Sequence, residues 1–146
     1  MNRLPLYLGL FLLTLITCAW SLCTSLLSAK PASDEVARGK YLVDEVARCP
    51  ECHTPRDAAG NLKAEAWLRG APIWIKPIAP ILNWADQAPP LAGLPSFTDQ
   101  QMENVLEQGV GPIGEILRPP MHTYHLHRDD ARAIIAYLKS LTPARR

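Results

Sequence analysis

The chain has no excess of charge of either sign. Its 146 residues include 15 Lys and Arg and 14 Asp and Glu, which gives a formal net charge of +1 at pH 7. Beyond the first thirty residues the two signs are well mixed, and no long block of one sign occurs. Because nucleic-acid binding needs a basic stripe or patch, this balance gives no electrostatic reason to expect a nucleic-acid partner.

Phenylalanine is scarce, whereas proline is abundant. The chain has only two Phe but fourteen Pro. Proline does not fit a helix interior or a central strand, so we expect few long elements, joined by extended loops. A length of 146 residues allows one small domain with an appendage.

Charge is absent altogether from Leu4 to Leu27. A helix over this stretch would be roughly 36 Å long at about 1.5 Å per residue, which is enough to cross a bilayer. The stretch exceeds the apolar core of a cleavable signal peptide, and Ser28–Ala32 matches the cleavage site poorly. We therefore predict that residues 1–30 form an uncleaved membrane anchor, with a removed signal segment as the alternative, and that residues 31–146 form one domain.

Two details of this N-terminal segment bear on its location. Arg3 precedes the apolar stretch, which predicts an N-terminus inside and a domain outside, facing the periplasm. Lipid modification at Cys18 is a weaker alternative to the anchor, because Thr17 immediately before it is a poor match to the attachment signal. Otherwise Cys18 and Cys23 are interpreted as apolar residues of a membrane helix.

Cys49-Pro50-Glu51-Cys52-His53 is a C-x-x-C-H sequence, the attachment signature of a c-type haem. Each thiol can add to one vinyl group of the porphyrin and form a thioether bond. The tight turn then brings the ring of His53 under the iron as the proximal ligand. C-type haem is attached on the outer side of the bacterial cytoplasmic membrane, so the motif and the predicted anchor indicate the same compartment.

Other kinds of site use similar cysteine spacings. A thioredoxin-like redox site also carries C-P-x-C, but it follows a buried strand, whereas residues 33–48 have a helical pattern. A structural zinc site needs a second ligand pair, for which only His122, His125 and His127 remain. A disulfide between Cys49 and Cys52 would close a very small loop with little entropic benefit.

The first helix of the domain is predicted from Ser33 to about Arg48, with Ser33 as its N-cap. Gly39 lies on its apolar face, where it either permits a close helix crossing or is simply tolerated. A short helix is expected over Lys63–Arg69, stopped by Gly70.

Two later helices have clear signals. The stretch from Thr98 to Gln108 opens with a capping box, and Gly109 follows it as a C-terminal cap. Met102 lies on the apolar stripe of this helix, so we interpret it as a core residue. The last helix is predicted from about Arg128 to Leu141.

Residues 71–95 contain six Pro, two Trp and almost no charge, so they are predicted to be neither a helix nor a central strand. A long apolar loop is a liability in water, but it makes sense if it wraps a large flat apolar ligand. The candidate haem contacts, each of which could equally be ordinary core, are Trp74, Ile75, Ile78, Ile81, Leu82, Trp84 and Leu91.

The iron needs a sixth ligand if the site is to carry electrons without binding substrate. Met121 follows two prolines, in a loop that can hold a thioether at a fixed distance with little ordering cost. A thioether ligand also raises the reduction potential. Of the candidates, which are Met102, Met121 and three later histidines, we therefore favour Met121, with one of the histidines (His122, His125 or His127) or an open position as the alternatives.

Two segments, GKYLVDEVARCPECHTPRD and RPPMHTYHLHRDDARAIIAYLKSL, resemble class I monohaem cytochromes c. They are especially similar to the exported cytochrome domains and subunits of bacterial dehydrogenases and respiratory chains. The resemblance covers Ser33 to Leu141 and implies an all-α fold, with crossing N- and C-terminal helices around one haem. It also implies thioether links at Cys49 and Cys52, with His53 and Met121 as the axial ligands.

The same resemblance implies that Gly39 and Tyr137 meet where the first and last helices cross. This chain departs from the family pattern at two places. His127 stands where relatives often have a Ser or Thr helix cap, so the last helix is expected to be less well capped. The Trp-rich segment Ile73–Trp84 is not general in the class, which leaves partner specificity open.

We therefore predict an electron carrier rather than an enzyme, with haem c as its cofactor and a dehydrogenase or oxidase as its redox partner. Alternatives are a subunit that works only within such a complex, and a haem enzyme or sensor with a labile distal ligand. A backbone carbonyl near Pro72 is expected to accept the ring N–H of His53, and Arg56, Asn83 or Trp84 to lie near the haem propionates.

Overall fold

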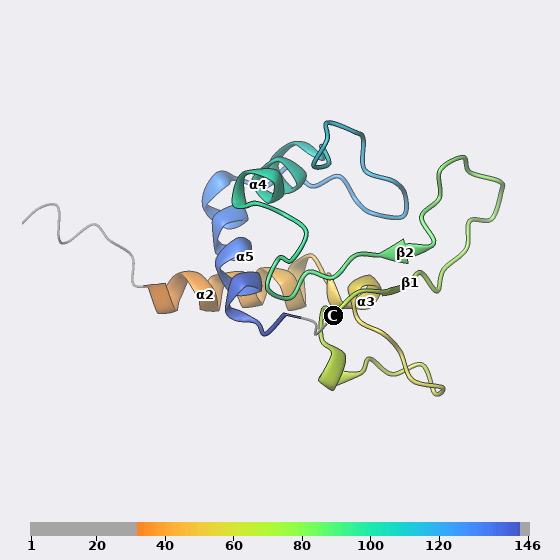
Figure 1. Ribbon diagram of the computed structural model, residues 1–146, viewed down its shortest axis with the longest axis horizontal. Helices are drawn as coiled ribbons and strands as arrows, with labels where there is room; N and C mark the ends of the chain where they lie inside the picture. The colour runs from red at the N-terminus through yellow and green to blue at the C-terminus, as the bar shows by residue number, and fades with distance from the viewer. Residues whose placement is uncertain (1–31, 144–146) are drawn as a thin grey trace, which may run out of the picture. The chain divides into compact units, whose positions relative to one another are not determined.

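The computed structural model describes residues 32–143, and most of their regular structure is helical (Figure 1). The helices are α2 (Ala32–Tyr41), α3 (Pro50–His53), α4 (Asp99–Gln108) and α5 (Arg128–Ser140). A π-helical turn, η1 (Leu42–Val46), continues α2, and a single 3-10 turn, η2 (Ala64–Ala66), follows α3. Strands β1 (Ala71–Pro72) and β2 (Gln87–Ala88) form an antiparallel ladder that pairs Ala71 with Ala88. The helical class is as predicted, and this short ladder was not expected.

α2 and α5 pack against each other at Gly39. A Cβ atom at this position would lie 1.8 Å from the carbonyl oxygen of Ala133 and 2.8 Å from the Cβ atom of Tyr137, both on α5. Glycine alone allows the two backbones to approach this closely. The predicted crossing, with Gly39 and Tyr137 at the contact, is therefore confirmed, and a merely tolerated glycine is excluded.

The N-terminal helix differs from the prediction at both ends. Ser33 lies inside α2 rather than at its N-cap, because Ala32 is already helical. At the other end α2 continues as the π-helical turn η1, which ends at Val46. Arg48 then adopts a left-handed backbone conformation with φ 51°, so the helix stops before the predicted residue and the chain turns into α3.

α4 and α5 form as their end signals predict. The side chain of Thr98 accepts a hydrogen bond from the N–H of Gln101, and the side chain of Gln101 accepts one from the N–H of Thr98. Gly109 follows α4 in a left-handed conformation. At the start of α5, Nδ1 of His127 accepts a long hydrogen bond of 3.4 Å from the N–H of Asp129. Histidine therefore does cap this helix, although weakly.

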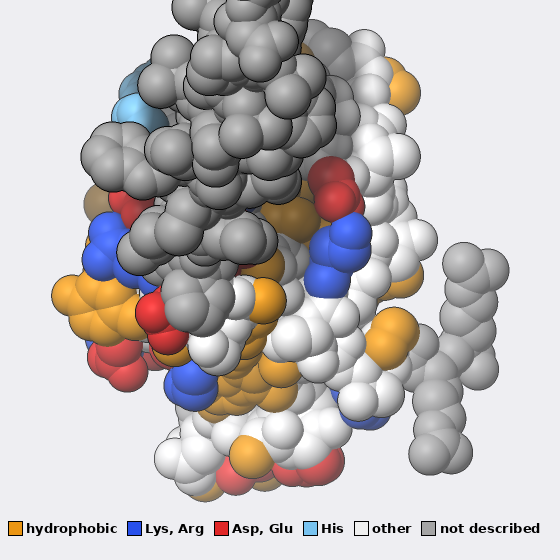
Figure 2. All heavy atoms as spheres, turned by 90° about the vertical axis from the view of Figure 1, so that its left-hand side faces the viewer, with side chains coloured by type: hydrophobic (Ala, Val, Ile, Leu, Met, Phe, Trp, Pro, Cys, Tyr) orange, Lys and Arg blue, Asp and Glu red, His pale blue; other side chains and the backbone are white. Residues whose placement is uncertain are grey.

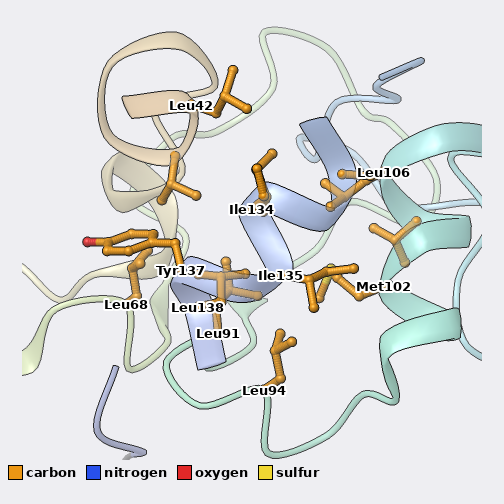
Figure 3. Packing of buried hydrophobic residues seen from close by; sticks show 14 of the residues in the cluster. Leu42, Leu68, Leu91, Leu94, Met102, Leu106, Ile134, Ile135, Tyr137 and Leu138 are labelled. Atoms are coloured by element: carbon orange, nitrogen blue, oxygen red, sulfur yellow. The ribbon is translucent and has the colours of Figure 1, made fainter. Parts of the chain in front are cut away.

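α5 lies at the centre of the hydrophobic core, between the N-terminal helix and α4 (Figure 3). Ile135 points toward Met102 on α4, and Met102 is only 3% exposed. This confirms the prediction that Met102 is a core residue. The other buried members of the cluster are Leu42, Val43, Leu68, Leu91, Ala92, Leu94, Val105, Leu106, Ala131, Ala133, Ile134, Tyr137 and Leu138.

The segment between α3 and α4 is mostly irregular. Residues 73–86 form a loop that projects beyond the β1–β2 ladder (Figure 1). The helix predicted over Lys63–Arg69 is wrong apart from the single turn η2. Leu68 and Gly70 have φ values of 56° and 82°, and these left-handed conformations prevent a helix from continuing.

Within residues 32–143 no helix is both long enough and apolar enough to cross a membrane. α5 has 13 residues, whereas a membrane span needs about 20. The anchor predicted within residues 1–30 lies outside the described residues and stays a prediction.

Charged side chains of both signs lie among one another on the face shown in Figure 2. Several of the ion pairs join α5 to its neighbours. Arg38 on α2 contacts Asp130 at 3.0 Å, and Lys139 on α5 contacts Asp99 on α4 at 2.8 Å. The mixed charge inferred from the sequence is therefore arranged as pairs between helices.

Candidate haem site

The C-x-x-C-H motif forms the single helical turn α3 and the residue before it. Pro50 occupies the first helical position, where the missing N–H costs nothing. The N–H of His53 donates to the carbonyl of Cys49 at 3.0 Å, which closes the turn. Because residues three apart lie on one face of a helical turn, Cys49 and Cys52 share a side of α3.

Both cysteines are free thiols with raised pKa values. Burial raises the pKa of the Cys49 thiol to about 12, and it also raises the pKa of Cys52. A thioredoxin-like redox site needs a cysteine with a lowered pKa, because the thiolate is the nucleophile. The raised pKa values of both thiols therefore disfavour the thioredoxin-like alternative.

The ring of His53 is buried and held by one backbone carbonyl. Nδ1 of His53 lies 2.8 Å from the carbonyl oxygen of Pro89. A carbonyl can only accept, so Nδ1 carries the proton and Nε2 keeps its lone pair for a metal. Burial lowers the pKa of His53, which favours the neutral ring that a metal requires.

The prediction that a carbonyl near Pro72 accepts the ring N–H of His53 is wrong, because the acceptor is the carbonyl of Pro89. The β1–β2 ladder pairs Pro72 with Gln87 and Ala71 with Ala88, so the residue after β2 lies beside α3. Gly70 makes this approach possible, since a Cβ atom there would lie 2.9 Å from the carbonyl oxygen of Ala88. The N–H of Gly70 also donates to the carbonyl of His53 at 2.8 Å.

Glu51, inside the motif, joins α3 to its surroundings. Its carboxylate accepts hydrogen bonds from Arg48 and Arg56. Both guanidinium groups lower the pKa of Glu51, and the hydrogen bond from Arg48 has the largest effect. Its backbone carbonyl accepts the indole N–H of Trp74 at 3.2 Å. The guanidinium of Arg56 lies 4.8 Å from the centre of the Trp74 ring. The sequence did not single out Glu51, because its contact with Trp74 joins residues that are 23 positions apart.

The loop that carries Met121 is fixed to the chain on one side by Arg118. This side chain donates to the carbonyl oxygens of Asn83 (3.0 Å) and Trp84 (2.9 Å). The N–H of Ala85 donates to the carbonyl of Pro119 at 2.7 Å. Arg118 was not expected to matter, because its partners lie more than thirty residues earlier.

On its other side the Met121 loop is joined to the start of the haem motif. The hydroxyl of Tyr124 donates to the carbonyl of Ala47 at 3.0 Å. Burial raises the pKa of Tyr124 to about 12, and the neighbouring Cys49 and Cys52 contribute to that rise. Met121 is half-buried and lies between these two attachments.

The polar groups around the site suit haem c. Nε of Arg56 and Nε1 of Trp84 are buried N–H donors that have no hydrogen-bond partner within the described residues. Such donors match the propionate carboxylates of a haem. Asn83, the third residue expected near the propionates, uses its carbonyl to hold Arg118. Together with two free thiols and a neutral histidine, the donor set fits the group that the motif predicts.

Comparison with known proteins agrees with this chemistry. The family model for cytochrome c matches residues 36–142. The fructose dehydrogenase cytochrome subunit of Gluconobacter japonicus is 35% identical over 116 residues, which are 75% of this chain and 22% of that protein. The cytochrome c subunit of the quinone-dependent alcohol dehydrogenase of Komagataeibacter europaeus is 35% identical over 124 residues, 77% of this chain and 26% of that protein.

A third relative, the "diheme cytochrome c-type" of Cereibacter sphaeroides, is 32% identical over 111 residues, 72% of this chain and 35% of that protein. The chain thus spans only about a quarter to a third of the length of these relatives. The residues matched by the family model nevertheless include the C-x-x-C-H motif, the helix crossing at Gly39 and the Met121 loop. The chain therefore belongs to the cytochrome c family, and residues 36–142 form a domain of the kind that carries covalently attached haem c and transfers electrons.

Proposed function

We propose that this chain is a membrane-tethered electron carrier that faces the periplasm, with His53 and Met121 as the axial ligands of its haem. The observation that carries the proposal is the hydrogen bond of 2.8 Å between Nδ1 of His53 and the carbonyl of Pro89. It fixes the ring orientation and leaves Nε2 available as a ligand. The free thiols of Cys49 and Cys52, on the same turn, would hold the porphyrin in place.

The bound group supplies a one-electron ferric/ferrous couple. The chain contributes a fixed environment for that couple. His53 is buried and hydrogen-bonded, so its ring does not need to move when the iron changes charge. Arg56 and Trp84 would offer their N–H donors to the propionate carboxylates of a bound haem.

Support for Met121 as the second ligand comes from the attachments of its loop. Arg118 holds one side of the loop to the carbonyls of Asn83 and Trp84, and Tyr124 holds the other side to Ala47. A loop ordered in this way presents a thioether with little entropic cost. His122 and His125 are exposed to solvent, which makes them weaker candidates than the half-buried Met121.

The location rests on the sequence. Leu4 to Leu27 carry no charge, and Arg3 precedes them, as in a helix that leaves the following domain outside. Removal of this segment, which would leave a soluble periplasmic domain, is the alternative.

A second candidate function is that of a subunit which works only inside a dehydrogenase or oxidase complex. It is favoured by the relatives that are named as cytochrome subunits of fructose and alcohol dehydrogenases. In that case the electron donor would be another subunit of the same complex. Purification in mild detergent separates the two proposals, because a free carrier should emerge as a lone haem protein.

The ligand assignment is tested by Met121→Ala. We expect the variant to lose the red thioether-to-iron absorption band of the ferric protein and to have a lower reduction potential, because a thioether stabilises the ferrous state. His122→Ala and His125→Ala are the matched controls and should keep both properties. An unchanged spectrum and potential in Met121→Ala would show that another group binds the iron.

A further inference from the structure

Four large apolar side chains of one loop are exposed to solvent. In residues 73–82, hereafter the Trp74 loop, Trp74 is 59% exposed, Ile81 is about half exposed, and Ile78 and Leu82 are almost fully exposed. Single exposed apolar residues are ordinary, but a cluster on one loop marks an interaction surface. All four were predicted to be either haem contacts or core residues; none of them is core, and their loop projects beyond the β1–β2 ladder (Figure 1). Lys76 is the only charged residue of this loop, so the contact it offers is apolar.

Hydrogen bonds hold both ends of the loop. At its base the N–H of Ile73 donates to the carbonyl of Asp86 at 2.9 Å. Just beyond its other end, Arg118 holds the carbonyls of Asn83 and Trp84. Two prolines within the loop restrict its backbone further. Because both ends are held and two prolines stiffen the backbone, docking on this loop would carry a smaller entropic cost than docking on an unrestrained loop.

Trp74 connects the exposed loop directly to the haem-attachment turn. Its indole N–H donates to the carbonyl of Glu51 at 3.2 Å, and Glu51 immediately precedes Cys52. Its ring packs against the guanidinium of Arg56, which is itself paired with the side chain of Glu51. One hydrogen bond and a short stretch of backbone thus join an exposed aromatic ring to a thiol that attaches the haem.

We propose that the Trp74 loop is the docking surface for an electron-donating protein, and that electrons enter through Trp74 and the carbonyl of Glu51 to Cys52. This rests on the proposed electron-carrier function. One electron leaves the reduced centre of the donor protein and one ferric iron becomes ferrous. No covalent bond forms or breaks, and no proton is transferred.

The chemistry of the loop favours a protein over a lipid surface. A loop with a single Lys lacks the basic cluster that anionic lipids attract. An exposed Trp beside aliphatic side chains is instead typical of the centre of a protein–protein interface. The relatives named as dehydrogenase subunits support an electron-donating protein as the occupant.

The first test compares variants of the full haem-loaded chain in membranes of the cells that make it. Ile78→Ser with Leu82→Ser removes apolar contact, and Trp74→Phe removes the indole N–H but keeps an aromatic ring. Ile113→Ser with Ile116→Ser is the matched control, because these two residues are also exposed but lie on another loop. Oxidised membranes receive the growth substrate that reduces the wild-type haem fastest, and haem reduction is followed by absorbance.

We expect the Ile78/Leu82 variant to be reduced at least about tenfold more slowly, a change that corresponds to about 1.4 kcal/mol. Trp74→Phe should be slowed roughly threefold, and the control should keep the wild-type rate. Reduction by ascorbate with a small mediator should be equal in all variants. Wild-type rates in both loop variants would overturn the proposal.

A second measurement does not depend on the haem. A photoreactive p-benzoylphenylalanine at position 82 should form an adduct with another membrane protein, and the same group at position 113 should not. Adducts with lipid alone, or with a second copy of this chain alone, would overturn the proposal. If ascorbate reduced the wild-type haem but no growth substrate did, the proposed carrier function itself would fail, which is a different result.

Discussion

Thr54 follows the haem motif and is only 1% exposed, and its hydroxyl accepts a hydrogen bond of 2.9 Å from the N–H of Leu68. Leu68 is itself fully buried, so water cannot take the place of the hydroxyl. This hydrogen bond ties Leu68 to the residue that directly follows α3. Nothing in the sequence marks Thr54, because its partner is fourteen residues away.

Replacing Thr54 by Val keeps the shape of the side chain but leaves the Leu68 N–H without a partner. We expect the free energy of unfolding to fall by about 1–3 kcal/mol, the cost of an unsatisfied buried donor. Urea unfolding of the holoprotein, followed by circular dichroism, measures the change. Thr54→Ser keeps the oxygen and should lose clearly less; equal losses in the two variants would contradict the role of the hydrogen bond.

Gly39→Ala places a methyl group where only 1.8 Å separates it from the carbonyl oxygen of Ala133. The backbones of α2 and α5 must move apart, which we expect to lower the free energy of unfolding by about 3 kcal/mol despite the better helix propensity of Ala. Ser33→Ala, on the exposed surface of the same helix, should change stability by less than about 0.5 kcal/mol. The same urea experiment applies, and a neutral Gly39→Ala would mean that the crossing is not tightly packed.

At the scale of elements, the helices with local end signals were predictable from the sequence. The capping box of Thr98 and the cap at Gly109 define α4. Both involve residues that are close together in the sequence, so they can be predicted from the sequence alone. α5 has an equally clear apolar stripe. The C-x-x-C-H motif was legible for the same reason, since all five residues are consecutive.

Features that depend on distant contacts were not predictable. The carbonyl that holds His53 comes from Pro89, because the β1–β2 ladder brings β2 alongside β1, and no local signal announces a ladder of two residues. The left-handed conformations of Arg48 and Leu68 shorten two predicted helices, although neither residue type favours them. Tertiary packing outweighed local propensity at these positions.

Arg118 gives the Met121 loop its attachment to residues 83–84, and Arg118→Ala should loosen that loop. If Met121 binds the iron, we expect cyanide to enter the ferric protein about tenfold faster, because losing roughly 1.4 kcal/mol of loop stabilisation raises the open population tenfold. Stopped-flow mixing measures the rate. Arg132→Ala, which breaks an exposed pair with Glu103 between α4 and α5, is the control and should bind cyanide at the wild-type rate.

At the scale of the whole molecule, the described residues form the cytochrome c domain, while the membrane location that we propose depends on residues 1–30. Covalent haem attachment and the charge-free stretch from Leu4 to Leu27 both predict a haem domain on the outer side of the cytoplasmic membrane. Electron carriers bound to a surface meet their partners in two dimensions, so the effective concentration of a partner is high even when affinity is low.

We expect haem c to stay in the membrane pellet after an alkaline carbonate wash, because an apolar helix resists extraction that releases peripheral proteins. Protease added to spheroplasts should remove the haem-carrying fragment, whereas inverted vesicles should protect it. Haem staining of gels measures both. Recovery of the haem in periplasmic fluid would support the cleaved segment, and protection in spheroplasts would reverse the orientation.

The two prolines after β2 help to decide which donor binds the Pro89 carbonyl beside His53. A backbone carbonyl at a strand end is normally claimed by an N–H of the neighbouring strand, but Pro89 and Pro90 have no N–H with which to extend the ladder, and β2 stops at Ala88. The N–H of Gly70, on the neighbouring segment, donates to the carbonyl of His53 instead. The Pro89 carbonyl is therefore left to a side chain, and the imidazole meets no rival donor from an extended strand. A pair of residues that looks like a simple strand breaker thereby selects the imidazole tautomer that a metal can use.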